Sequence, residues 1–119
     1  MKQNDFVPEE YRYDLQIITE TTEQIIRDFQ NSDLKIIYSG NNKLAFDELK
    51  QQLITFLRTL MKNSTALHAL LYRVDISEKE FSAGMNKSST PNEEIIAELI
   101  IRREFKKVLT RKFFSKKDT

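Results

Sequence analysis

The chain of 119 residues contains no cysteine and only one histidine. The lack of cysteine excludes disulfides, iron–sulfur clusters, cysteine-type zinc sites and thiolate catalysis, and it indicates a reducing compartment. Because His68 is the single histidine, no metal site that needs two histidines can form within one chain. We therefore expect neither a metal nor any other cofactor.

Glycine and proline are scarce, with two of each, whereas leucine, isoleucine, glutamate, glutamine and lysine are common. This composition favours helices over sheet and argues against long linkers. Even the densest apolar stretch, 95–101, is interrupted by Glu98, and the first residues lack the apolar core of a signal peptide. We expect a single all-α domain over 1–119, with frayed ends at 1–6 and 115–119, in a bacterial cytoplasm.

Hydrophobic spacing and capping signals predict a compact bundle of four or five helices. Apolar residues recur at steps of three and four over about 8–30 and again over about 42–62, which predicts the first two helices. Capping oxygens at 63–65 then precede a short third helix that ends near Asp75.

Two further helix starts are visible in the second half of the chain. Ser77 followed by Glu80 is a capping-box pattern, which predicts a short helix ending near Gly84. The last helix is expected over about 91–113. Its start combines an N-cap residue, a proline in the first turn and an acid, namely Thr90, Pro91 and Glu93.

The segment 34–38, Leu-Lys-Ile-Ile-Tyr, favours extended backbone. It is short, branched and aromatic, and polar turn residues flank it at 31–33 and 39–42. A lone strand has no partner for its backbone groups. The segment is therefore either an extended connector that packs against the core or a strand that pairs across a dimer.

Charge is segregated between the two ends of the chain. Residues 1–33 hold eight acids and three bases, whereas 102–119 hold eight bases and two acids, and the middle is neutral. The ends either form a binding surface or pack against each other. A heptad assignment of the first helix places only Asp14 and Asp28 beside the apolar seam, so acids such as Glu20 are expected to face solvent. Pairing within the chain then explains part of the segregation.

The last helix changes its apolar side near Arg102. Before Arg102 the apolar residues lie on one side of the helix, and after it they lie on nearly the opposite side. The two groups are Ile95, Ile96, Leu99 and Ile100, then Ile101, Phe105, Val108 and Leu109. The helix therefore either kinks or passes from one packing partner to another. Four cations beyond the change, here called the basic ridge, are candidates for contact with an anion or a partner: Arg103, Lys106, Lys107 and Arg111.

Other polar residues have simpler interpretations. His68 lies among apolar neighbours, which favours a partly buried structural imidazole over a catalytic one. Arg73 is expected to extend its charge to solvent or to pair with an acid and so fix packing. The stretch 84–89 lacks the glycine directly before its lysine and the preceding strand of a phosphate loop, so a plain loop is favoured. Two pairs of acids have the helical spacing that could hold Mg²⁺, namely Glu20 with Glu23 and Glu94 with Glu98. Solvated surface acids are the favoured interpretation of both pairs.

These observations rank three classes of function. A non-enzymatic protein–protein interaction module, with self-association possible, is favoured by the extended segment, the second apolar side of the last helix and the opposite charges of the two ends. The alternative is binding of nucleic acid or another polyanion through the basic ridge, although no nucleic-acid motif supports it. An enzyme acting on a small molecule is third, because it needs a pocket with convergent acids.

Overall fold

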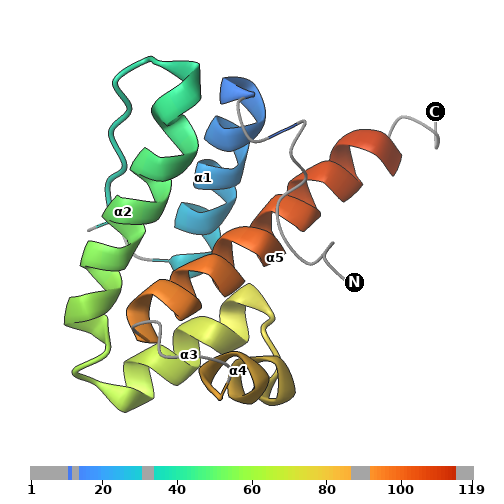
Figure 1. The fold of residues 1–119 in the computed structure, drawn as a ribbon. Coiled ribbons are helices and arrows are strands. Elements are labelled where there is room, and N and C mark those ends of the chain that lie inside the picture. The colour runs from blue at the N-terminus through green and yellow to red at the C-terminus, as the bar shows by residue number, and fades with distance from the viewer. Residues whose placement is uncertain (1–10, 12–13, 31–33, 87–91, 115–119) are drawn as a thin grey trace.

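The predicted fold class is confirmed: the structure, a computed structural model, is a compact all-α bundle (Figure 1). It describes residues 11, 14–30, 34–86 and 92–114. The frayed ends and the Thr90-Pro91 helix start predicted above lie outside these residues. Within them the helices are α1 (Leu15–Phe29), α2 (Asn42–Leu60), α3 (Ser64–Val74), α4 (Glu78–Met85) and α5 (Asn92–Phe114). None of these helices is both long enough and apolar enough to cross a membrane.

Helix α5 is the central element of the bundle. It contacts α1, α2, α3 and α4, and Figure 1 shows it running diagonally across the molecule. Its first half packs against α2 and α4, and its second half packs against α1, as the side-chain pairs described below show. The change of apolar side in its sequence is therefore a change of packing partner within one continuous helix. Both sides supply buried residues: Ile96, Ile100, Ile101, Phe105 and Val108.

Helix α1 begins later than the sequence predicts. Asp14 is extended and caps the helix by accepting a hydrogen bond from the Ile17 amide at 3.2 Å. The predicted start near Pro8 is therefore wrong, because an extended residue cannot lie inside a helix. The helix ends at Phe29, where Gln30 takes the left-handed conformation of a C-cap.

The capping signals predicted for α3 and α4 are confirmed. Asn63 caps α3 through its side-chain oxygen, and Asn41, which was not predicted as a cap, does the same for α2. Ser77 and Glu80 form the predicted capping box at the start of α4, with both reciprocal hydrogen bonds present. These helices therefore begin where short-range chemistry places them, within a residue or so of the predicted positions.

Gly84 lets α4 approach α5 closely. A β-carbon at this position would lie 3.2 Å from Ile95 Cγ2 and 3.3 Å from Leu99 Cδ1. We expect Gly84→Val to destabilise the fold by about 1–3 kcal/mol, because a branched side chain has to push the two helices apart. Urea unfolding followed by circular dichroism measures this. The matched control is Ala83→Val on the exposed side of the same helix, and equal losses in the two variants would contradict the prediction.

Candidate interaction site

The basic end of α5 packs against the acidic helix α1. The Lys107 ammonium lies 2.6 Å from Asp28 Oδ2, and that of Lys112 lies 3.0 Å from Glu20 Oε2. Glu20 was expected to face solvent; its side chain is 30% exposed, but it also pairs with Lys112, which the sequence did not indicate. The heptad assignment assumed that α1 packs against a single helix along one apolar seam, whereas α1 contacts α2, α3 and α5. In addition, long lysine side chains of α5 reach residues beside the seam. Pairing within the chain thus explains more of the charge segregation than the sequence indicated.

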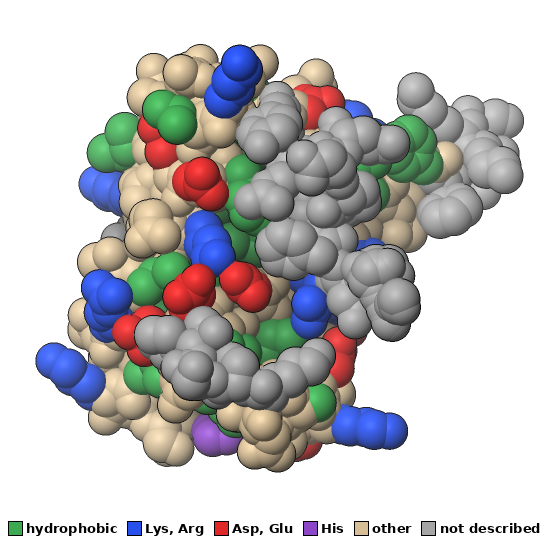
Figure 2. Space-filling view, in the orientation of Figure 1, with side chains coloured by type: hydrophobic (Ala, Val, Ile, Leu, Met, Phe, Trp, Pro, Cys, Tyr) green, Lys and Arg blue, Asp and Glu red, His purple; other side chains and the backbone are tan. Residues whose placement is uncertain are grey.

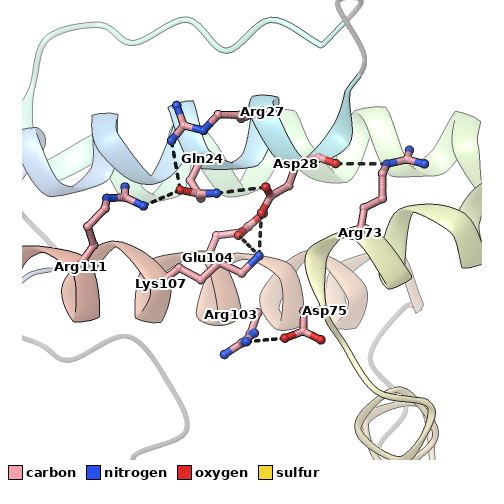
Figure 3. A network of polar contacts seen from close by, with 9 residues as sticks. All are labelled: Gln24, Arg27, Asp28, Arg73, Asp75, Arg103, Glu104, Lys107 and Arg111. Carbon is pink, nitrogen blue, oxygen red and sulfur yellow. Dashed lines mark hydrogen bonds and ion pairs between the residues drawn. The ribbon is translucent and has the colours of Figure 1, made fainter.

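Three of the four basic-ridge cations have partners inside the molecule (Figure 3). Besides Lys107, Arg111 donates to Gln24 Oε1 at 2.8 Å, and Arg103 donates to Asp75 Oδ2 at 2.6 Å. Lys106 is exposed and has no partner among the residues that the structure describes. On the face shown in Figure 2, acidic and basic side chains are interspersed rather than gathered into a patch of one sign.

Arg73 closes the C-terminal end of α1. Its guanidinium donates to the carbonyl oxygens of Asp28 at 3.2 Å and Phe29 at 3.1 Å. The last carbonyls of a helix have no partner within the helix, so a cation that binds them stabilises its end. Arg73 therefore fixes packing as expected, although through backbone carbonyls rather than through an acid.

A buried carboxyl lies at the centre of the α1–α5 contact. The Glu104 side chain is fully buried, and its Oε1 lies 3.0 Å from the Lys107 ammonium. Burial, aided by the neighbouring carboxyl of Asp28, raises the pKa of Glu104 to about 8. For Asp28, burial works in the same direction, but hydrogen bonds led by that from Lys107 keep its pKa below the usual value. At neutral pH the cluster therefore holds one proton on Glu104 and an ion pair between Asp28 and Lys107.

This cluster joins α1 to α5. Displaced pKa values of neighbouring carboxyls are typical of active sites, where such groups line a cleft. One hollow in the surface is lined by His68, Tyr72 and Phe81 among others, and another is lined by Phe56 and Arg73 among others. Glu104 lines neither of these two hollows. Sequence reasoning did not single out this residue, although its position among Ile101, Phe105 and Val108 on the apolar side of α5 is a signal that could have found it.

The remaining candidates have structural contacts. His68 is exposed rather than partly buried, because it lies one position beyond the inward-facing Leu67, and its Nδ1 is 2.9 Å from the Ser64 carbonyl oxygen.

Glu94 and Glu98 share the Lys50 ammonium, at 3.3 and 2.7 Å, and so join α5 to α2. Within the described ranges no group of three potential ligand side chains is suited to a metal ion. Of the stretch 84–89, which was predicted as a loop, Gly84 and Met85 belong to α4 and Asn86 is its C-cap, and residues 87–89 lie outside the described residues.

The segment 34–38, called the connector from here on, is extended and lies along the first half of α2. Its Ile37 amide donates to Gln52 Oε1 at 2.9 Å, and Gln52 Nε2 donates back to the Ile37 carbonyl at 2.8 Å. The Ser39 amide donates to Glu48 Oε1 at 3.2 Å. A side-chain amide of α2 thus takes the place of a neighbouring strand. Within one chain the segment packs as the extended connector of the first sequence alternative. The second alternative, pairing across a dimer, concerns a second copy and stays a prediction.

The connector faces the core on one side and solvent on the other. Leu34 is buried, and the Tyr38 hydroxyl is hydrogen-bonded to Thr22 of α1. Between them, the Ile37 side chain is 75% exposed, and Leu44 in the first turn of α2 is 47% exposed. Large apolar side chains this open to water are candidates for contact with another protein.

The geometry defines a small helical bundle with charged interhelical contacts, an apolar core and an exposed extended connector. No protein-family model matches the chain, and neither a curated protein nor a solved structure is significantly similar to it. The function is therefore argued from the chain's own residues.

Proposed function

We propose that the protein is a non-enzymatic protein–protein interaction module that associates with itself, and that it works in the cytoplasm of a bacterial cell. The observation that carries the proposal is the connector, whose Ile37 side chain is 75% exposed on extended backbone. The other two features that favoured association in the sequence have uses within the chain. The second apolar side of α5 is buried, and acids of α1 pair with bases of α5.

The polyanion alternative has less support than it had from the sequence. A phosphate group would compete with Asp28 for Lys107, with Asp75 for Arg103 and with Gln24 for Arg111. Among the four cations of the basic ridge, Lys106 is the one that has no partner in the described part of the chain. Counterion release from a single lysine adds little affinity, so we do not advance this function.

Self-association is tested by size-exclusion chromatography with light scattering over a series of protein concentrations. The expected result is a mass that rises with concentration from the monomer value of 14.1 kDa towards that of a dimer. A constant monomer mass up to the highest concentration would contradict this part of the proposal.

A further inference from the structure

One backbone edge of the connector has no hydrogen-bond partner among the described residues. In extended backbone the amide and carbonyl of one residue point to the same edge, and those of its neighbours point to the other. The amide and carbonyl of Ile37 point to Gln52 of α2. The amides and carbonyls of Ile36 and Tyr38 therefore point to the opposite edge, away from α2. Among the described residues neither Ile36 nor Tyr38 forms a backbone hydrogen bond. In Figure 1 the connector runs beside α2 along the outline of the molecule.

We infer that this edge pairs in antiparallel fashion with the connector of a second copy of the chain, about a two-fold axis at Ile37. The inference rests on the proposed function and names its interface. In this register Ile36 of each copy exchanges two backbone hydrogen bonds with Tyr38 of the other. The two Ile37 residues then face each other without hydrogen bonds, at a Cα separation of about 4.5 Å, and each covers the exposed side chain of the other.

A second copy fits this edge better than another occupant for two reasons. The described residues contain no strand, so none of them offers a strand that could pair with this edge. The same register also matches charges, because Lys35 lies opposite Ser39 of the other copy, whose amide is bound to Glu48. Lys35 has no partner in the described part of its own chain. The two Lys35 residues are about 13 Å apart along the strands, so they do not repel each other strongly.

The exposed surface beside the connector sets the strength of the dimer. Leu44 lies one helical turn before Glu48 on the same side of α2 and is 47% exposed. A five-residue strand pair falls well short of the roughly 1,000 Å² typical of stable interfaces, and Leu44 adds to it without reaching the range of an obligate dimer. The inferred dimer is therefore concentration-dependent.

The cysteine-free sequence makes the register directly testable. Under mild oxidation we expect Ile37→Cys to form a covalent dimer, because the inferred Cα separation lies within the range for a disulfide. Lys35→Cys and Ser39→Cys should cross-link with each other when mixed and only weakly with themselves. Tyr72→Cys is the matched control, since Tyr72 is a large apolar residue that is 84% exposed on α3, far from the connector in sequence.

A second variant separates failure of this interface from failure of self-association. We expect Ile37→Asp to weaken dimerisation about ten-fold or more, because two carboxylates then face each other across the axis, whereas Tyr72→Asp leaves it unchanged. Circular dichroism checks that both variants are folded. If the wild type dimerises while Ile37→Asp dimerises equally well, or while Ile37→Cys fails to cross-link, this inference is overturned and the proposed function stands. A wild type that is always monomeric contradicts the proposed function itself.

Discussion

Replacing Lys107 with methionine is expected to lower the free energy of unfolding by about 2–4 kcal/mol at pH 7. The Asp28 carboxylate, whose side chain is 18% exposed, then loses its cation while the fully buried Glu104 stays beside it. Removing one member of a buried ion pair costs more than the pair contributes, because the remaining charge stays poorly solvated. We place the loss below that of a fully buried pair because the Lys107 side chain is 22% exposed.

The adjacent residue provides the control for this prediction. Lys106→Met removes the same charge and adds the same side chain one position earlier, on the exposed side of α5. It is expected to change stability by no more than about 0.5 kcal/mol. Urea unfolding at fixed pH and salt measures both variants. Similar losses in the two would show that the effect comes from net charge or helix propensity, and not from the cluster with Asp28 and Glu104.

The second large effect is a pH-dependent gain in stability from Glu104→Gln. In the folded protein the pKa of Glu104 is about 8, against an ordinary value of 4.5. Between these values the unfolded chain releases the proton and the folded chain retains it, so wild-type stability falls as pH rises. Glutamine does not ionise, so its stability does not fall with pH in this way, and it resembles the protonated acid in shape. We expect little difference below about pH 4.5, and a gain that grows to about 2–4 kcal/mol by pH 8 and then levels off.

Melting temperatures measured from pH 4.5 to pH 9 test this profile. Glu23→Gln is the control, because Glu23 is exposed on α1 and its replacement removes the same charge without any buried partner. A carbon-13 NMR titration of the Glu104 carboxyl in the wild type measures the pKa directly. If the melting temperatures of the wild type and of Glu104→Gln change with pH in the same way across this range, the assignment of a buried, protonated acid is refuted.

Short-range chemistry made most of the fold predictable. An N-cap is a contact between residues two or three positions apart, so Asn41, Asn63 and Ser77 are visible without knowledge of the tertiary structure. The same holds for the apolar spacing that predicts each helix. The exception is the start of α1, which apolar spacing placed near residue 8, whereas Asp14 supplies the cap.

The candidate site was less predictable because its contacts join distant parts of the chain. Gln52 carries no pattern that reveals its pairing with Ile37, fifteen positions away. The basic ridge was visible as a row of cations, but whether they face solvent depends on which helix lies beside α5. Lys107 meets Asp28 across 79 positions, and that contact changes the meaning of the charge at both ends.

The sequence alone therefore determined the all-α class, the helix starts in the middle of the chain, the extended connector and the lack of cysteine chemistry, since each follows from composition or from residues within one or two turns. The tertiary structure decided which side of α5 meets which partner, that acids of α1 pair with bases of α5, that Glu104 is buried, and that one backbone edge of the connector has no hydrogen-bond partner among the described residues. These depend on the relative placement of whole helices, which buried apolar area sets and which no local pattern encodes.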